Sequence, residues 1–156
     1  MPTKRFQLRP MADTDLEAVE DLWVAGWSDT LPEIDFKARR PWLEARLAAL
    51  AERGAMVTVA EDLWLGRVVG FVTLERDNGH LDQLTVDPAV RAEGAAVRLM
   101  DHAKAQAPGM IRLEVNVANP RAIHFYEREG FVRVGESVSP SSGLPIYTYE
   151  WRPSPG

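Results

Sequence analysis

The sequence predicts one domain of the α/β or α+β class, with a mixed sheet covered by helices. Three observations support this class. The length of 156 residues fits a single domain, expected to span 1–156. Strands and helices are predicted in the order β-α-α-β-β-β-α-β-α-β-β, with no internal repeat and no interior linker. Cysteine is absent, so disulfides and thiolate metal sites are excluded.

The first third of the chain predicts a short strand followed by two helices. Residues 6–9 have strand character, and apolar residues then recur at helical spacing up to about Gly26. A second helix is predicted over 35–53, with Pro41 in its first turn, where proline is tolerated. The intervening segment 27–36 contains polar breaks and a proline, so it is predicted to be a loop.

The middle of the chain changes to the period of β-strands. Segments 56–61 and 67–76 are rich in Val, Phe and Thr and predict strands. The turn sequence 77–79 (Asp-Asn-Gly) joins the second of them to a strand over 80–86 as an antiparallel hairpin.

Helices and short strands alternate through the rest of the chain. Helices are predicted over 94–107 and 120–129, and strands over 110–115, 131–134 and 146–151. Segment 137–145, rich in Ser, Pro and Gly, is predicted to be a loop.

Composition excludes several classes of function. The net charge of −5 argues against binding to the nucleic-acid backbone, which needs a basic face. No apolar run approaches the roughly 18 residues that a membrane span needs, and the first ten residues hold no signal-peptide core. We therefore expect a soluble cytoplasmic protein with no membrane partner. His80, His102 and His124 have no metal-ligand spacing, so no metal is expected.

The segment from Leu84 to Val97 carries the first chemical signal. A strand ends at Val86, and a turn then leads through Arg91 into a helix whose first residues, from Gly94 on, are small. The first N–H groups of a helix lack internal partners, and the helix dipole attracts anions to them. This arrangement suits a phosphate or pyrophosphate, although a short Gly/Ala-rich turn before a helix more often reflects ordinary tight packing.

The segment 113–131 carries the second signal. A strand ends in a polar turn, and Asn119 is placed to cap the helix that follows. Phe125 and Tyr126 lie on that helix, and Gly130 is well placed at its end. Taken in isolation, the two aromatic residues are simply core residues.

Together the two segments resemble the GNAT superfamily of N-acetyltransferases. Arg91, Gly94 and Ala96 match its Gln/Arg-x-x-Gly-x-Gly/Ala coenzyme-binding motif. About 25 residues later the chain matches the superfamily's next motif, through Asn119, Ala122, Phe125, Tyr126, Gly130 and Phe131. The resemblance is dense from about Val69 to Phe131.

The resemblance implies the GNAT acyl-CoA N-acyltransferase fold, a central, mixed, mostly antiparallel sheet flanked by helices. In it, a splayed gap separates the strand ending at Val86 from the strand ending at Val115. It also implies acetyl-CoA as a co-substrate. The expected coenzyme-binding residues are Leu84, Thr85, Val86, Arg91, Ala92, Glu93, Gly94, Ala95, Ala96, Val97, Asn119, Ala122, Phe125 and Tyr126.

The chain departs from the family pattern at Glu93. The loop usually carries a basic residue there, whereas this chain reads Ala92-Glu93-Gly94-Ala95-Ala96. A carboxylate pointing at the pyrophosphate would weaken coenzyme binding. This departure leaves a second function open, that of a non-catalytic acetyl-CoA or CoA-binding module.

The resemblance also implies catalytic roles. Tyr126 matches the family's general acid, and a backbone amide near Val86 polarises the thioester carbonyl. Family members often carry a carboxylate base on the preceding strand, and Asp82 is the first candidate here. His80, on the same face by strand alternation, and Glu75 are alternatives. An ordered water is a further alternative.

The expected acceptor is a primary amine of a small molecule or peptide. Its pocket is predicted from the first two helices, their loop and the last hairpin, with Trp27 and Leu31 as substrate-contacting residues. Asp29 and neighbouring acids are placed to attract a cationic amine, or else form a solvated loop. The oligomeric state stays open; similar proteins are commonly homodimers, and the C-terminal strands could pair across subunits.

Overall fold

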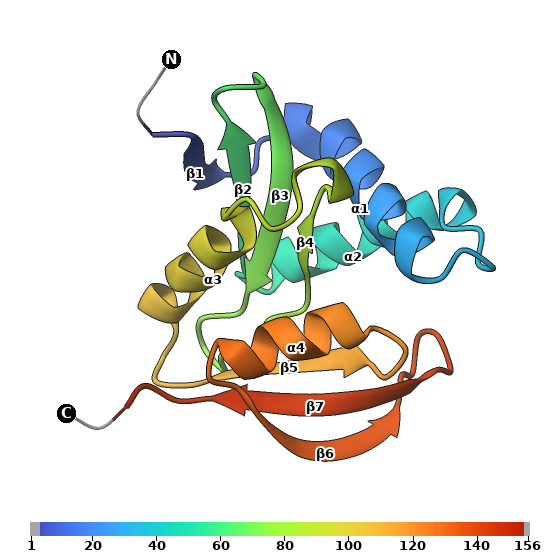
Figure 1. Cartoon of the computed structure of the whole chain (residues 1–156), viewed down its shortest axis with the longest axis vertical. Helices are drawn as coiled ribbons and strands as arrows, with labels where there is room; N and C mark the ends of the chain where they lie inside the picture. The colour runs from blue at the N-terminus through green and yellow to red at the C-terminus, as the bar shows by residue number, and fades with distance from the viewer. Residues whose placement is uncertain (1–3, 155–156) are drawn as a thin grey trace.

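The computed structural model describes residues 4–154 and shows seven strands in two antiparallel sheets (Figure 1). The first sheet has the order β1-β2-β3-β4, formed by Phe6–Pro10, Met56–Asp62, Arg67–Leu74 and Leu84–Val86. The second has the order β5-β7-β6, formed by Ile111–Asn116, Pro145–Trp151 and Val132–Val138. Residues 1–3 and 155–156 of the expected domain lie outside the described range.

Four α-helices of the described chain flank the sheets: α1 (Leu16–Thr30), α2 (Arg40–Glu52), α3 (Ala95–Gln106) and α4 (Pro120–Arg128). The helices α1 and α2 cover one face of the first sheet, α3 lies on the other face, and α4 packs on the second sheet (Figure 1). This arrangement confirms the predicted class of antiparallel sheets flanked by helices.

The core consists of two main clusters on opposite faces of the first sheet. Strand β3 is buried on both faces, because Phe71 packs with α1 and α2 while Val72 packs with α3. The cluster around Val72 continues through Leu99 of α3 to Leu113 of β5 and Tyr126 of α4. The same cluster therefore holds the two sheets together.

Helix α1 is longer than predicted. Gly26 does not end it; the helix runs to Thr30, whose hydroxyl donates a hydrogen bond to the Gly26 carbonyl over 3.1 Å. A Cβ at Gly26 would lie 3.3 Å from Cγ2 of Thr85, so the glycine allows α1 to approach β4 closely. Prediction of a loop from residue 27 was therefore wrong, and Trp27 lies on the helix.

The strand predicted over 80–86 is also shorter than expected, because only Leu84–Val86 pair as β4. Leu81 and Leu84 are three residues apart, yet both pack into the same cluster. A regular strand would send them to opposite faces. The backbone is irregular at residues 82–83, where the Gln83 N–H bonds to the Thr73 hydroxyl rather than to a carbonyl.

Other boundaries shift by smaller amounts. Residues 37–39 form a 3₁₀ turn before α2, which therefore begins at Arg40, with Pro41 in its first turn as predicted. Strand β6 extends beyond the predicted 131–134, because polar residues up to Val138 pair with β7. The sequence of this edge strand lacks the apolar alternation that would have predicted it.

The two sheets are joined by backbone hydrogen bonds at one point. The Leu81 N–H donates to the Arg112 carbonyl, and the Arg112 N–H donates to the Gly79 carbonyl, each over 2.9 Å. Beyond this junction, no ladder connects β4 to β5 in the described chain. The strands therefore separate, as the family resemblance implied.

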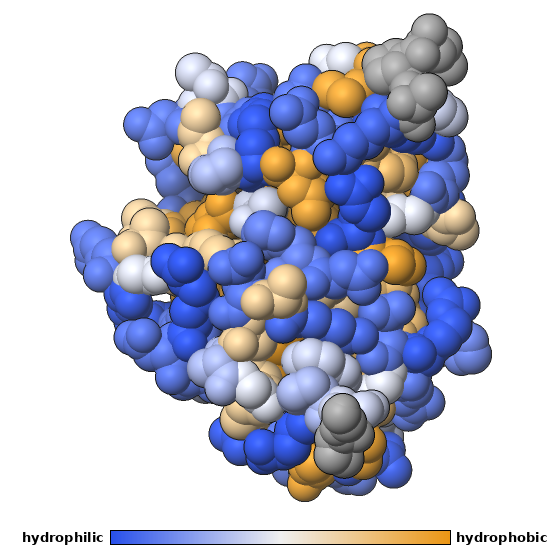
Figure 2. Space-filling model, turned by 90° about the vertical axis from the view of Figure 1, so that its left-hand side faces the viewer, coloured by the Kyte–Doolittle hydropathy of each residue, from blue (hydrophilic) through white to orange (hydrophobic). Residues whose placement is uncertain are grey.

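The surface seen in Figure 2 is mainly hydrophilic, with hydrophobic side chains in small separate patches. In the described range, no helix has the length and apolar character needed to cross a membrane.

Gly79 tests the importance of the junction. It has φ of +77°, and a Cβ there would overlap the Met110 carbonyl oxygen. We expect Gly79→Ala to lower the free energy of unfolding by about 2–3 kcal/mol, through backbone strain and loss of close contact between the sheets. Chemical denaturation measures this. The control is Gly54→Ala, with φ of +80° but open surroundings; an equal loss in both variants would contradict a special role for the junction.

Candidate functional site

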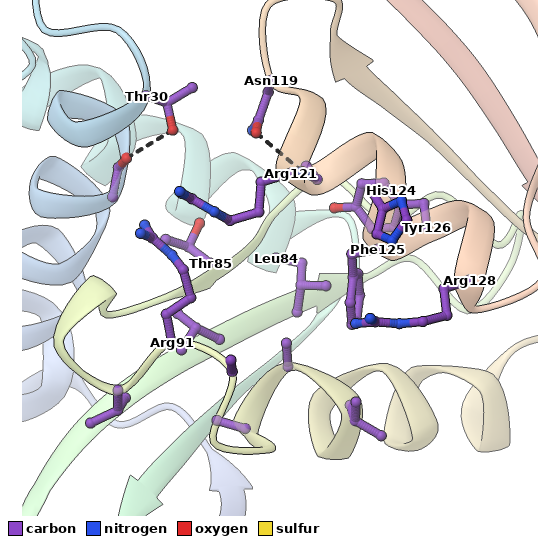
Figure 3. Close-up of a pocket in the computed structure, with 18 of the residues that line it drawn as sticks. Thr30, Leu84, Thr85, Arg91, Asn119, Arg121, His124, Phe125, Tyr126 and Arg128 are labelled. Atoms are coloured by element: carbon purple, nitrogen blue, oxygen red, sulfur yellow. Dashed lines mark hydrogen bonds between the residues drawn. The ribbon is translucent and has the colours of Figure 1, made fainter.

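A cavity of about 910 Å³ lies among β4, the loop before α3, α4 and the end of α1 (Figure 3). It brings together almost all of the predicted coenzyme-binding residues. Those on its wall are Leu84, Thr85, Val86, Arg91, Ala92, Gly94, Ala95, Ala96, Val97, Asn119, Ala122, Phe125 and Tyr126. Two segments far apart in sequence thus face one space.

The loop before α3 has an unusual backbone. Ala92 and Gly94 both have positive φ, +66° and +106°, and α3 begins directly afterwards at Ala95. The first helical N–H to reach a carbonyl is that of Arg98, which bonds to Gly94 over 3.1 Å. The amides of the preceding turn therefore have no helical partner and can bind an anion in the cavity.

Glu93 does not line the cavity. Its carboxylate forms an ion pair with Arg5, whose guanidinium also contacts the buried Asp62. The acidic residue in the loop is thus turned toward the N-terminal strand and neutralised there. The structure gives no support to Glu93 as a coenzyme contact, and the expected repulsion of a pyrophosphate is removed.

Strand β4 offers a free edge to the cavity. Its residues pair with β3 alone, in the register Val72 to Leu84 and Gly70 to Val86. The backbone groups on the opposite edge face the gap that opens toward β5. A ligand with amide groups can add to such an edge as an extra strand does.

Helix α4 is fixed at both ends. The side-chain oxygen of Asn119 accepts a hydrogen bond from the Ala122 N–H over 3.2 Å, which confirms its capping role. At the other end Gly130 has φ of +94°, and the N–H of Phe131 donates to the Tyr126 carbonyl over 3.0 Å. This Schellman geometry sets the orientation of the helix and of its aromatic residues.

Tyr126 points from α4 toward the space between α4 and β4 (Figure 3). The residue is 7% exposed and packs against Phe125 and Phe131. Its hydroxyl has no hydrogen-bond partner among the described residues, although it belongs to the cavity wall. Burial raises the pKa of the phenol above its ordinary value, so the hydroxyl stays protonated and able to donate.

The structure does not bring Asp82 to the cavity, which corrects its assignment as the base. Both carboxylate oxygens of Asp82 accept hydrogen bonds from Arg46 of α2, over 2.6 and 3.1 Å. Burial opposes ionisation, but the contacts from Arg46 and Gln83 outweigh it and lower the pKa. The carboxylate is thus ionised, paired and poorly suited to accept a proton at neutral pH.

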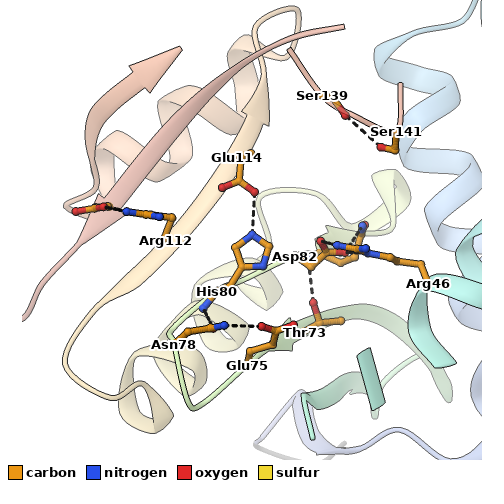
Figure 4. Close-up of polar contacts among 12 residues, drawn as sticks. Arg46, Thr73, Glu75, Asn78, His80, Asp82, Arg112, Glu114, Ser139 and Ser141 are labelled. Carbon is orange, nitrogen blue, oxygen red and sulfur yellow. Dashed lines mark hydrogen bonds and ion pairs between the residues drawn. The ribbon is translucent and has the colours of Figure 1, made fainter. Parts of the chain in front are cut away.

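Glu75 is similarly engaged, with Asn78 and Arg53. His80 lies at the junction of the two sheets, with its Nε2 2.8 Å from Oε1 of Glu114 on β5 (Figure 4). The hydrogen bond that the His80 ring donates to Glu114 raises the pKa of His80, and burial opposes this effect. The charges of Asp82 and Glu75 also raise the pKa, by smaller amounts.

The two predicted substrate residues fall in different places. Trp27 lines the main cavity and stacks on Phe36, with ring centroids 5.6 Å apart. Leu31 is buried and lines a second, smaller cavity of about 490 Å³. Its other lining residues come from the α1–α2 loop, the turn after β5 and the β6–β7 loop: Glu33, Ile34, Asn116, Val117, Ala118, Leu144 and Pro145.

The two cavities share the same two backbone segments. Thr30 lines the first cavity and Leu31 the second, and the chain after β5 contributes Ala118 to the second and Asn119 to the first. The two cavities therefore border the same two segments of the chain.

Sequence reasoning missed several residues of the main cavity: Gly26, Thr30, Val90, Pro120, Arg121, His124 and Arg128. Two of them, Gly26 and Thr30, lie at the end of α1, which was wrongly predicted to stop at about Gly26. On α4 the signal was present, because Arg121, Phe125 and Arg128 follow the i, i+4, i+7 spacing of one helix face. Within the described residues, no cluster of His, Asp or Glu could hold a metal ion.

Comparisons with known proteins agree with this geometry. A segment of 77 residues is 39% identical to the peptidyl-lysine N-acetyltransferase YjaB of Salmonella typhimurium; it covers 49% of this chain and about half (51%) of that protein. The solution structure of apo YjaB from Escherichia coli superimposes with a TM-score of 0.76 and 27% identity, over 95% of this chain and 98% of that one.

A more distant structure shares the fold. The PaiA N-acetyltransferase of Thermoplasma acidophilum, in complex with coenzyme A, has a TM-score of 0.74 and 18% identity, over 96% of this chain and 99% of that one. The family model for the acetyltransferase (GNAT) family matches residues 16–131, which include both cavity-forming segments. The chain belongs to the acetyltransferase (GNAT) family.

Proposed function

We propose that this protein is an N-acetyltransferase that moves the acetyl group of acetyl-CoA to the side-chain amine of a lysine within a peptide or protein. The observation that carries the proposal is the cavity itself, where unpaired amides of α3, the free edge of β4 and the Tyr126 hydroxyl face one space. The lysine acceptor is supported by the YjaB relatives, which are peptidyl-lysine N-acetyltransferases; this chain spans about half of their length.

Each part of the coenzyme has a matching group of the protein in the cavity. The pyrophosphate lies on the amides of residues 95–97, where the helix dipole favours an anion. The pantetheine arm carries two amides and pairs with the free edge of β4 at Leu84–Val86. Asn119, whose side-chain oxygen is used in capping, keeps its amide nitrogen for the same arm.

The transfer forms one bond and breaks another. The neutral amine nitrogen attacks the thioester carbonyl carbon, the C–S bond breaks, and the sulfur leaves as a thiolate. A backbone N–H of β4 near Val86 stabilises the negative charge that develops on the carbonyl oxygen. One proton must leave the amine, and one must reach the sulfur.

Tyr126 supplies the proton to the sulfur. Its hydroxyl faces the gap and has no competing partner among the described residues. Burial raises its pKa, which keeps the hydroxyl protonated but weakens it as an acid, so the proton moves only as negative charge develops on the sulfur beside it. A donor positioned beside the sulfur neutralises the leaving thiolate.

His80 accepts the proton from the amine; it does not line the cavity itself, so a water molecule carries the proton between them. Its bond to Glu114 fixes one ring nitrogen as the donor, which leaves the other free as an acceptor. His80 directly precedes Leu81, where the backbone joins the two sheets. The wall of the main cavity begins at Leu84, three residues after Leu81. Arg46 holds Asp82 ionised and lowers its pKa, whereas Glu114 pairs with His80 and raises its pKa, which makes the imidazole the stronger base.

The lysine enters through the smaller cavity. Its wall is mostly apolar and suits the methylene stem of the side chain, and Glu33 supplies a carboxylate for a cationic peptide. Because this cavity adjoins the main one along Thr30–Leu31 and Ala118–Asn119, the amine arrives beside the thioester.

The proposed function predicts acetylation of peptides in the presence of acetyl-CoA. A short peptide with one internal lysine should yield a product heavier by one acetyl group, with release of one equivalent of free thiol. Mass spectrometry and a thiol assay measure these. The matched peptide with arginine in place of lysine should not react. Coenzyme binding without turnover on any amine would instead indicate the non-catalytic binding module.

Tyr126→Phe tests the acid. We expect kcat to fall by about 10²-fold or more, since positioned acids contribute ~10²–10⁴-fold. The melting temperature should stay close to that of the wild type, because no hydrogen bond of the hydroxyl is lost. Steady-state kinetics and calorimetric titration with CoA measure the change. A kcat within twofold of wild type would remove Tyr126 from the mechanism.

Glu114→Gln tests the base. A base must be unprotonated, so kcat/KM rises with pH through the pKa of His80. Glu114 raises that pKa, and its removal should move the acid limb of the pH profile to lower pH. His80→Gln should abolish the limb, and Glu136→Gln, an exposed acid on β6, should leave it in place. An acid limb that Glu114→Gln and His80→Gln both leave unchanged would show that another group accepts the proton.

A further inference from the structure

One carboxylate connects three elements that border the main cavity. Oδ2 of Asp29, on α1, lies 3.0 Å from Nη1 of Arg91 in the loop before α3 and 3.4 Å from Nη1 of Arg121 on α4. The two guanidinium groups come from opposite sides of the cavity and both extend toward the end of α1 (Figure 3). Both arginines also line the cavity wall.

The ion pairs with Asp29 occupy two arginines, Arg91 and Arg121, that could otherwise bind an anionic ligand in the cavity. Three arginines lie on the cavity wall: Arg91 and Arg121 form ion pairs, and Arg128 forms none with the described residues. Asp29 is ionised, because Arg91 and Arg121 lower the pKa of its carboxyl. Its charge offsets the positive potential at the side where the phosphates of a coenzyme would lie.

We propose that Asp29 is a latch: in the ligand-free protein its carboxylate holds Arg91 and Arg121 across the cavity, and the phosphate groups of the coenzyme displace it from them. This inference rests on the proposed function, since it takes the coenzyme as the ligand. It gives Asp29 a positioning role and replaces the earlier expectation that this acid attracts the amine.

The exchange is energetically feasible. The Asp29 side chain is 48% exposed and that of Arg121 is 57% exposed, and ion pairs at such positions contribute only modestly to stability. A phosphate group carries more charge and more acceptor oxygens, and it forms stronger hydrogen bonds with guanidinium groups. The coenzyme can therefore displace Asp29 from both arginines. Breaking these two ion pairs costs free energy, so the wild type binds the coenzyme less tightly than it would without Asp29.

Displacement would also free the end of α1. Asp29 directly precedes Thr30 in the main cavity and Leu31 in the smaller one. The latch thus connects coenzyme occupancy to the segment that separates the two cavities.

The test is calorimetric titration of CoA into wild type, Asp29→Asn and Glu17→Gln. Glu17 is an exposed acid at the start of the same helix, so its variant removes the same charge away from the cavity. We expect Kd for CoA to fall about three- to fivefold in Asp29→Asn and to change little in Glu17→Gln. The KM for acetyl-CoA should fall in parallel with kcat unchanged.

Acetyl-pantetheine provides a second arm, because it carries the thioester without the phosphates. Its KM should be the same in wild type and Asp29→Asn. An unchanged or raised Kd for CoA in Asp29→Asn, an equal gain in Glu17→Gln, or an equal gain with acetyl-pantetheine would each overturn the latch. Failure of wild type to bind CoA at all would overturn the proposed function itself, which is a distinct result.

Discussion

The backbone hydrogen bonds of Arg112 with Leu81 and Gly79 set the geometry of the whole site. They join the two sheets at one point, and from there β4 and β5 separate, so that the facing edge of β4 keeps unpaired backbone groups. Such an edge normally invites aggregation or pairing with another chain. Here α1, α4 and the loop before α3 surround it, and the edge becomes one wall of a cavity. Gly79 allows its own segment and the segment at Met110 to approach this closely, because it has no Cβ.

The site divides its work between backbone and side chains. The anion site is made of amides at the start of α3, so a chain with net charge −5 can still receive a polyanion. The chemistry falls to a few side chains whose surroundings fix their protonation: Tyr126 by burial, His80 by its bond to Glu114. Acidic residues near the site are mostly neutralised, Glu93 by Arg5 and Asp82 by Arg46.

Much of this could be predicted from the sequence where the signal is local. The cap at Asn119, the glycine at 130 and the order of strands and helices all depend on neighbouring residues, and the structure confirms them. Predictions failed where a distant residue decides. Gly26 ends no helix but lets α1 approach Thr85 of β4, and nothing near Asp82 in the sequence indicates its pairing with Arg46.

The roles of the loop residues could be judged only in part for the same reason. Glu93 looked unfavourable in the sequence because its partner, Arg5, lies 88 residues away. The positive φ of Ala92 likewise has no simple signature, since alanine rarely adopts that conformation. The family motif nevertheless located the loop itself, because it marks a change of backbone direction at Gly94.

The left-handed conformations at Ala92 and Gly94 set the direction of the backbone in this loop, and the backbone rather than the side chains would contact the ligand. Since the ligand meets amides rather than side chains, exchanging one small residue for another alters little that the ligand can sense. Inserting or deleting a single residue would rotate every amide of the first turn of α3 away from its direction. Within related sequences, the length of this loop should therefore drift far less than its composition does.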